Sequence, residues 1–312
     1  MNIVFWGSPE FAVPSLNILA QKYNIIFVVT APDRPCGRKL KITPPPLKTA
    51  AVNLGLNVFQ PEDLTTDNTY QKLKIANADL FIVVSYGKIL NKKILTIPKM
   101  FAINLHASIL PKFRGAAPIN WALLSGERKT GVTVIKMNEY MDRGESILTK
   151  EILIGDNDDV ISLLGKLSRL GAETLVEAVD LLINGKAVFT KQNEEEATYA
   201  PSLKKSDGRI KWVKSSVEII NHIRAMAGWP TAYTFYKGKN LKIFKARILD
   251  DEIKDEKCLP GTVIAPFKIK QIIVKTGSGA VSLEEIQLQS SRRMRASEFL
   301  AGHHLSPGER FS

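Results

Sequence analysis

Short runs of consecutive apolar residues in the first half of the chain constrain its fold more than any other feature of the sequence. A run that is apolar throughout indicates a strand covered on both faces, as in a parallel sheet. Segments with helical spacing lie between these runs, and this alternation is typical of right-handed βαβ units. We therefore predict an α/β fold, with a Rossmann-like, mostly parallel sheet and helices on both faces. The predicted strands are residues 2–6, 24–30, 79–85, 101–105, 131–137 and 147–154, and the predicted helices include 48–56, 70–76, 117–125 and 160–183.

The last third of the chain has a different pattern. A helix is expected over 215–227, and short β runs follow it, separated by Gly, Pro and charged residues. Closely spaced short strands of this kind are typical of a small antiparallel β-barrel, similar to an OB fold. A polar stretch with three consecutive glutamates separates the two patterns, and we expect a linker there. The predicted domains are a catalytic domain at 1–188, a linker at 189–208 and a barrel at 209–312.

The chain carries an excess of positive charge, with 43 Lys and Arg against 31 Asp and Glu, and a formal net charge of +12. Much of the excess lies in residues 209–312, which hold 18 Lys and Arg against 10 Asp and Glu. A basic domain is a candidate surface for a polyanion such as a nucleic acid. The charge alone does not distinguish a nucleic-acid-binding surface from a surface whose charge only keeps the protein soluble.

Several classes of protein are disfavoured by what the sequence lacks. No stretch approaches the ~20 apolar residues of a membrane helix, and residues 1–7 read as a buried strand rather than a signal peptide. The two cysteines, Cys36 and Cys258, form no CxxC pair, which favours a reducing compartment and gives no metal site. The sequence also has no GxGxxG, P-loop, GxSxG or HExxH motif. We expect a cytoplasmic protein with no bound metal.

Two polar residues at the end of one predicted strand are the leading candidates for chemistry. Asn104 and His106 are two positions apart, so on a strand they face the same side. The carboxyl ends of parallel strands are where open α/β sheets build their sites. An amide supplies a neutral N–H donor and an imidazole can hold or release a proton, which suits a reaction in which a carbonyl becomes a tetrahedral oxyanion. A purely structural histidine remains the alternative.

A third group is needed to orient the imidazole or to return a proton to it, and Asp142 is the leading candidate. It lies in the turn 138–144 that follows the predicted strand 131–137, so it can lie beside the carboxyl edge of the sheet. The pattern alone leaves open that Asp142 only stabilises its own turn. Glu139 and Glu145 remain competitors for the same role.

Residues 31–47 break the α/β pattern with five prolines and several basic residues. We predict a loop without regular secondary structure here. Long loops in compact domains are uncommon unless they are functional or disordered. The basic side chains make the loop a candidate contact for RNA, and an ordinary exposed loop is the alternative.

Residues 108–119, SILPKFRGAAPI, resemble the long signature of the methionyl-tRNA formyltransferases. The Asn-x-His motif upstream and the Met-Asp-x-Gly motif downstream are similar to the family pattern in order and spacing. The resemblance extends over nearly the whole chain and includes segments 7–12, 32–38 and 84–87 and the basic C-terminal barrel. It implies the formyltransferase fold for the first domain.

The resemblance also implies a reaction, the transfer of the formyl group from N10 of 10-formyltetrahydrofolate to the α-amine of methionyl initiator tRNA for translation initiation. By matched position, Asn104 would donate a hydrogen bond to the developing oxyanion. His106 would add a second donor and help to move protons, and Asp142 would orient His106 and relay protons.

The same resemblance implies where the two substrates bind. The residues similar to the family's folate contacts are Ser108, Ile109, Leu110, Pro111, Tyr86 and Gly87. The basic loop is similar to an insertion that contacts the acceptor arm of tRNA, and its candidate residues are Arg34, Arg38, Lys39 and Lys41. The implied partners are initiator tRNA and the folate co-substrate, with no membrane and no metal, and the expected state is a monomer.

Related formyltransferases could use the same three catalytic residues on another amine. A purine-pathway ribotide is disfavoured, because an enzyme of that type would lack residues 209–312. An amine on a sugar nucleotide is harder to exclude. A non-catalytic RNA-binding protein would explain the charge, but it would leave Asn104, His106 and Asp142 without a purpose.

Overall fold

The structure is a computed structural model of the chain and describes residues 1–37, 40–249, 258–264 and 271–312. The chain divides into two compact units. The first unit contains Met1–Pro118, Lys129–Ile154 and Leu163–Pro201, and the second contains Ile119–Arg128, Gly155–Ser162 and Ser202–Ser312. No helix within the described ranges combines the length and the apolar character that a membrane span requires.

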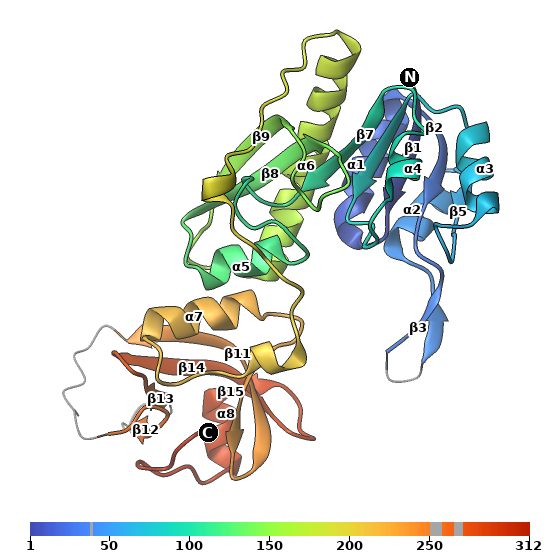
Figure 1. Ribbon diagram of the computed structural model, residues 1–312. Helices are drawn as coiled ribbons and strands as arrows, with labels where there is room; N and C mark the ends of the chain where they lie inside the picture. Colours follow the sequence, from blue (N-terminus) through green and yellow to red (C-terminus); the bar gives the residue numbers. More distant parts are fainter. Residues whose placement is uncertain (38–39, 250–257, 265–270) are drawn as a thin grey trace. The chain divides into compact units, whose positions relative to one another are not determined.

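The first unit is built around a seven-stranded sheet (Figure 1). Its strands are β1 (Asn2–Gly7), β2 (Asn24–Val29), β5 (Val58–Phe59), β6 (Leu80–Val84), β7 (Phe101–His106), β8 (Lys129–Lys136) and β9 (Ser146–Leu153). They follow the order β5-β2-β1-β6-β7-β8-β9. The first five in this order are parallel, and β8 and β9 are each antiparallel to the strand before them. The predicted mostly parallel sheet is confirmed.

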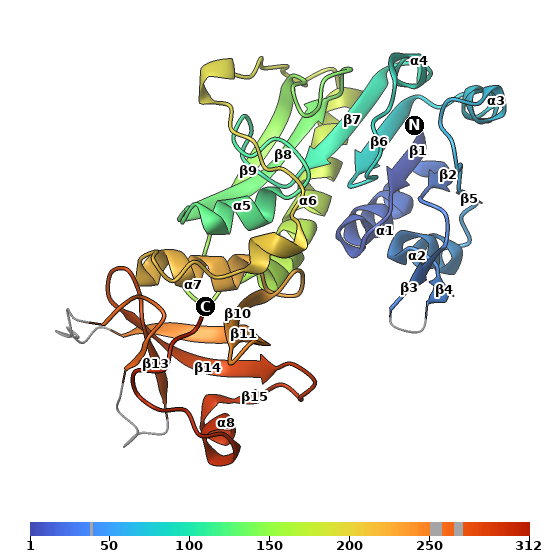
Figure 2. The same cartoon turned by 60° about the horizontal axis from the view of Figure 1, so that its bottom comes forward.

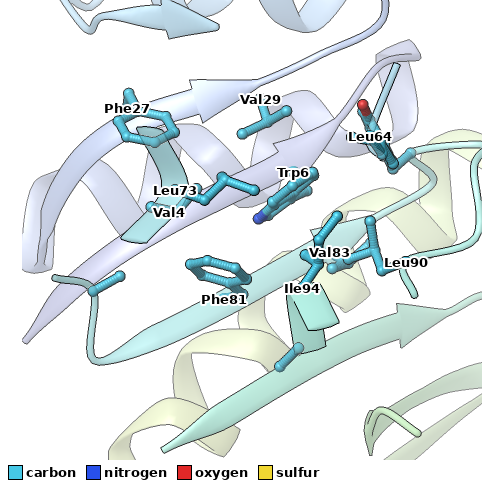
Figure 3. Close-up of a cluster of buried hydrophobic side chains, with 13 residues drawn as sticks. Val4, Trp6, Phe27, Val29, Leu64, Leu73, Phe81, Val83, Leu90 and Ile94 are labelled. Atoms are coloured by element: carbon cyan, nitrogen blue, oxygen red, sulfur yellow. The ribbon is translucent and has the colours of Figure 1, made fainter. Parts of the chain in front are cut away.

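Helices cover both faces of this sheet, as predicted. They are α1 (Val13–Lys22), α2 (Pro46–Asn53), α3 (Asp67–Ile75), α4 (Lys92–Leu95) and α6 (Val160–Ile183), which belongs to this unit from Leu163 onward. On one face α6 packs so closely on β7 that a Cβ on Gly171 would lie 2.6 Å from Leu105 Cδ2. The other face carries a cluster of buried side chains around Trp6, to which α3 and α4 contribute Leu73 and Ile94 (Figure 3). Burying each large apolar side chain stabilises the fold by about 1.5–3 kcal/mol.

A hairpin occupies part of the segment for which the sequence predicts an irregular loop. β3 (Arg34–Cys36) and β4 (Lys41–Thr43) pair antiparallel, with Pro35 opposite Ile42. The pair extends away from α2 (Figures 1 and 2). The prediction of a loop was wrong because both strands of a two-stranded ribbon are edges, where the missing N–H of a proline can face solvent.

The second unit is built on an antiparallel sheet. Its strands are β10 (Ala232–Tyr236), β11 (Lys239–Leu249), β12 (Val263–Ile264), β13 (Ile272–Lys275), β14 (Ala280–Leu288) and β15 (Met294–Arg295). They follow the order β10-β11-β14-β13-β12, and β15 pairs with β14. The helices are α5 (Pro118–Leu124, in this unit from Ile119), α7 (Ser216–Ala225) and α8 (Ala296–Gly302).

The last residues of the chain join the two edges of this second sheet. At the β10 edge, Phe235 and Ser312 exchange two backbone hydrogen bonds of 3.0 and 3.1 Å. At the β12 edge, the N–H of Val263 donates to the carbonyl of Glu309 (2.8 Å), and the N–H of Gly308 donates to the carbonyl of Val263 (2.9 Å). Both edges are thereby covered, and the sheet curls into the small antiparallel barrel that the sequence predicts.

Candidate active site

The carboxyl end of β7 changes from apolar to polar side chains on one face of the sheet. On this face Ala102 belongs to the buried cluster, and Asn104 and His106 follow it at two-residue spacing. Leu105 points to the opposite face, where α6 covers it. His106 is buried and Asn104 is partly exposed. The strand therefore presents an amide and an imidazole side by side at the end of a well-packed apolar surface.

Both ring nitrogens of His106 face acceptor groups. Nε2 lies 2.9 Å from the carbonyl oxygen of Phe113, and because a carbonyl only accepts, Nε2 carries a hydrogen. Nδ1 lies 3.6 Å from Oδ2 of Asp142, longer than a direct hydrogen bond. The two side chains are 7% and 14% exposed, so solvent screens their interaction only weakly. The Phe113 carbonyl thus fixes the ring with Nδ1 directed to the carboxylate.

The turn that carries Asp142 is held close to the sheet. Asp142 has a φ of 53°, in the left-handed region that Asp adopts more readily than most residues. Its Oδ2 accepts a hydrogen bond of 2.8 Å from the backbone N–H of Gly115. Two residues on, a Cβ at Gly144 would lie 1.7 Å from the carbonyl oxygen of Lys136, so only glycine fits there. The Asp-x-Gly spacing therefore brings the turn against β8 and its carboxylate to His106.

The side-chain amide of Asn104 is free to bind another molecule. It forms no hydrogen bond with any residue in the described part of the chain. Asn104 is opposite Val83 of β6, which in turn is opposite Trp6 of β1, so the three side chains form one row across the sheet. The indole N–H of Trp6 is buried and likewise has no partner among the described residues. Among the described residues neither N–H donor has an acceptor, and of the two only the Asn104 amide belongs to a partly exposed residue that another molecule can reach.

The loop that follows β7 is stabilised by its own polar groups. The hydroxyl of Thr133 donates to the carbonyl of Ser108 (2.7 Å) and accepts from the backbone N–H of Leu110 (3.2 Å). The Ser108 hydroxyl donates to a carbonyl of the same loop at 2.6 Å. Ser108 and Leu110 are buried, whereas Ile109 and Pro111 are half-buried. In the segment predicted to contact folate, the accessible side-chain surface therefore comes mainly from Ile109 and Pro111.

Tyr86 and Gly87, also predicted folate contacts, lie after the carboxyl end of β6. The ring of Tyr86 is buried in the apolar cluster, edge-on to Trp6 with the ring centroids 5.2 Å apart. Burial raises the pKa of the Tyr86 hydroxyl to about 12. Within the described ranges this hydroxyl has no hydrogen-bond partner. Gly87 is exposed and has a φ of 83°, so its backbone is accessible while the tyrosine ring is part of the core.

Two family models together match most of the chain. The formyl transferase model matches residues 1–179, and the model of the formyl transferase C-terminal domain matches residues 202–304. A protein named methionyl-tRNA formyltransferase from Caldanaerobacter subterraneus subsp. tengcongensis is 44% identical over 310 residues, which cover 99% of each chain. The chain belongs to the methionyl-tRNA formyltransferase family. It is therefore a member of a family of formyl-transferring enzymes.

Solved structures share the fold of this methionyl-tRNA formyltransferase family member. One is WlaRD, described as a sugar 3N-formyl transferase in the presence of dTDP and 5-N-formyl-THF. It has a TM-score of 0.67 and 19% identity, covering 94% of this chain and 99% of that one. A methionyl-tRNA formyltransferase from Clostridium thermocellum has a TM-score of 0.56 and 17% identity, covering 81% of this chain and 95% of that one. At these identities the likeness shows the fold alone.

Two of the four residues predicted to contact tRNA lie in the described part of the chain. Arg34 and Lys41 are exposed on the β3–β4 hairpin, whereas Arg38 and Lys39 lie outside the described residues. The base of the hairpin is fixed by Asp33, which accepts hydrogen bonds from Gln60 (2.8 Å) and Lys48 (2.7 Å). These two partners, Gln60 first, hold the pKa of Asp33 below its usual value. In this family member the hairpin is thus anchored at its base and exposed along its strands.

Sequence reasoning did not select two residues that lie behind Asp142. The side chain of Arg114 is buried and bonds to Gln192 and Glu194. Gln192 in turn donates to the backbone carbonyls of Asp142 and Gly144. Arg114 lies within the family signature, and that position was a signal that could have marked it. Gln192 lies in the polar stretch predicted as a linker, where no local pattern distinguishes it.

Proposed function

We propose that this protein transfers the formyl group of 10-formyltetrahydrofolate to the α-amine of methionyl initiator tRNA. One observation carries the proposal, the meeting of the His106 imidazole with the Asp142 carboxylate at 3.6 Å, beside the free amide of Asn104. The end of β7 and the distant turn that carries Asp142 thus bring a donor, a proton carrier and a charge to one sheet edge. This is the set of groups that acyl transfer through an oxyanion requires.

The proposed reaction uses these groups in a defined order. The methionyl amine attacks the formyl carbon, and the formyl oxygen becomes an oxyanion that accepts a hydrogen bond from the Asn104 amide. His106, charged at least transiently, adds a second donor, and Asp142 balances that charge and orients the ring. As the carbon–N10 bond breaks, the attacking amine loses one proton and N10 gains one through the His106–Asp142 pair. The products are formyl-methionyl-tRNA and tetrahydrofolate.

The folate is proposed to lie along the carboxyl edge of the sheet. Ile109 and Pro111 would offer apolar side-chain surface to its ring, Ser108 and Leu110 would shape the loop backbone, and Gly87 would offer exposed backbone. Tyr86 would act from the core by supporting that backbone, because its ring is buried against Trp6. A neighbour of the same fold that was determined with a formylated folate supports this class of co-substrate.

The tRNA is proposed to bind through exposed basic groups. Arg34 and Lys41 lie on the hairpin, and Arg38 and Lys39 belong to the segment that joins its strands. The excess of basic residues over 209–312 provides a second positive surface, and contacts of this kind bind phosphates without reading bases. We retain 1–188, 189–208 and 209–312 as the proposed catalytic domain, linker and tRNA-binding barrel, in a protein that acts in the cytoplasm beside the translation machinery.

A single assay tests this function. Purified protein is incubated with 10-formyltetrahydrofolate and, in separate reactions, with charged initiator tRNA, uncharged initiator tRNA or a dTDP-linked amino sugar. We expect formylation of methionine on the charged tRNA and no product with the other two. Formylation of the amino sugar in preference to the charged tRNA would show that the enzyme acts on a sugar nucleotide.

A further inference from the structure

Behind the proposed catalytic carboxylate lies a buried cation. The side chain of Arg114 is among the largest that are fully buried, with 1% of the residue exposed. Its guanidinium makes two hydrogen bonds of 2.9 Å to the carboxylate of Glu194 and bonds of 3.1 and 2.8 Å to Oε1 of Gln192. Glu194 supplies the main interaction that raises the pKa of Arg114, so the guanidinium is a permanently charged, fixed donor.

Gln192 connects this cation to the turn that carries Asp142. Its Oε1 faces the guanidinium of Arg114, and its Nε2 donates to the carbonyls of Asp142 (2.8 Å) and Gly144 (2.7 Å). The orientation of the amide is therefore set by chemistry, because only oxygen can face the guanidinium and only nitrogen can face the two carbonyls. The Gln192 side chain thus binds the backbone on both sides of Arg143.

The turn has few other connections at this point. Residues 138–143 are mostly exposed. Apart from the bonds that Gln192 and Gly115 donate to Asp142, their hydrogen bonds in the described chain are local to the turn or run through the side chain of Arg143. Asp142 holds a φ of 53°, which costs free energy and persists only because the surrounding contacts fix it. The carboxylate itself is tied to the backbone N–H of Gly115, the residue next to Arg114. Arg114, Gln192 and Asp142 therefore form a closed ring of contacts.

We propose that Gln192 is a positioning residue for formyl transfer, which holds the backbone of residues 142–144 so that the Asp142 carboxylate faces His106. Arg114 fixes the orientation of the Gln192 amide. The geometric part of this inference stands on contacts within the protein, and the part that concerns rate rests on the proposed function. A displacement of about 1 Å at a reacting group lowers turnover by up to about 100-fold. Loss of the two Gln192 hydrogen bonds to the turn is therefore expected to lower kcat measurably.

Gln192→Glu separates positioning from stability. Glutamate keeps an oxygen for Arg114, so the buried cation stays paired, but it has no N–H for the two carbonyls. Asn193→Asp is the matched control, because it makes the same amide-to-acid change at the neighbouring, exposed position and retains the oxygen that caps the 3-10 turn Glu194–Glu196. Gln192→Met, which also removes the acceptor for Arg114, is a second variant that loses the donors without adding charge.

The first measurement is amide hydrogen exchange at Gly115 in the free protein, which needs no substrate. In Gln192→Glu we expect exchange at least about tenfold faster, because the carboxylate that binds this N–H is released, and no change in Asn193→Asp. The second measurement is single-turnover formyl transfer. We expect Gln192→Glu to lose about 10–100-fold in rate with little change in KM for either substrate, and to lose almost nothing further when Asp142 is already Asn.

The outcomes decide separately between this inference and the proposed function. Unchanged Gly115 exchange in both Gln192 variants overturns the positioning role. An equal loss of rate in the wild-type and Asp142→Asn backgrounds also overturns it, because Gln192 would then not act through Asp142. If wild-type protein transfers no formyl group to methionyl-tRNA, the proposed function fails, and the Gly115 exchange alone decides the geometric inference.

Discussion

His106 and Asp142 have side chains that are 7% and 14% exposed, whereas Leu40 and Ile42 of the hairpin segment are 71% and 67% exposed. The first pair is held by the Phe113 carbonyl, the Gly115 N–H and the turn around Gly144. The hairpin is held at its base, through Asp33, and its strands pair mainly with each other.

The difference matches what the two regions are proposed to do. Groups that stabilise a transition state must be in place before the substrate arrives, because moving them during the reaction would cost part of the stabilisation. Contacts with a charged polymer such as tRNA need less exact positioning of the protein groups, since long basic side chains can adapt to the positions of the phosphates. Changes at the site should therefore appear in kcat, and changes at the hairpin in KM for tRNA.

The largest effect is expected from Asn104→Ala. Loss of one oxyanion donor typically costs about 2.7–4 kcal/mol, or about 100–1,000-fold in kcat, with little change in folate or tRNA binding. Steady-state kinetics with both substrates varied measure this. Lys41→Ala, on the hairpin, is the contrasting variant and should keep kcat within about twofold. A kcat for Asn104→Ala within a few-fold of wild type would contradict the claim that changes at the site lower kcat whereas changes at the hairpin do not.

Gly144→Ala should come next, because its Cβ has no room beside the Lys136 carbonyl. We expect a loss of about 1–3 kcal/mol in the free energy of unfolding and, since the turn must move, about 10–100-fold in kcat. Urea unfolding and single-turnover kinetics measure the two losses. Gly165→Ala in α6 is the control, because no atom of the described residues lies within 4 Å of its added Cβ, and this variant should fold at least as stably as wild type. Equal behaviour of the two variants would contradict the account of the turn.

A smaller effect is expected from the double variant Arg34→Ala/Lys41→Ala. Removing two phosphate contacts should raise KM for tRNA by about tenfold and lower the slope of log affinity against log salt by up to about 2, with kcat retained. Salt-dependent tRNA binding measures the slope. Lys74→Ala/Lys186→Ala removes the same charge from exposed positions elsewhere in the first unit and should leave the slope unchanged. Identical slopes for the two double variants would show that the hairpin takes no part in binding.

The smallest effect is expected in the pH dependence of stability. Arg114 lowers the pKa of Glu194 below its ordinary value of 4.5. The stabilisation that the Arg114–Glu194 ion pair gives the folded protein is therefore fully present above about pH 4.5. It is lost as pH falls through the lower pKa that Glu194 has in the folded state. Between about pH 5 and about pH 3, the melting temperature of wild type should fall more steeply than that of Glu194→Gln. Parallel curves for the two proteins would mean that the ion pair contributes nothing.

Local pattern was enough to predict much of the α/β unit from the sequence. The helix predicted at 160–183 is observed as Val160–Ile183, because its apolar residues recur at helical spacing over many turns. The shared face of Asn104 and His106 follows from the two-residue period of a strand. Asp142 was selected from its turn and from the family resemblance, and the sequence left Glu139 and Glu145 as competitors.

The parts that could not be predicted depend on contacts between distant residues. Gln192 bonds to carbonyls 50 and 48 positions earlier in the chain, and no local pattern in a polar stretch reports such partners. Closure of the barrel depends on Ser312 reaching Phe235. The hairpin was missed because prolines suppress the prediction of strands even where an edge tolerates them.

The central claim is that the Asp142 carboxylate acts on the reaction through His106, and Asp142→Asn tests it most directly. Asparagine keeps an oxygen for the Gly115 N–H and removes the charge that faces Nδ1. Single-turnover transfer of formyl to methionyl initiator tRNA should fall at least about 100-fold, with tRNA and folate binding unchanged. A variant that transfers formyl as fast as wild type would contradict the account.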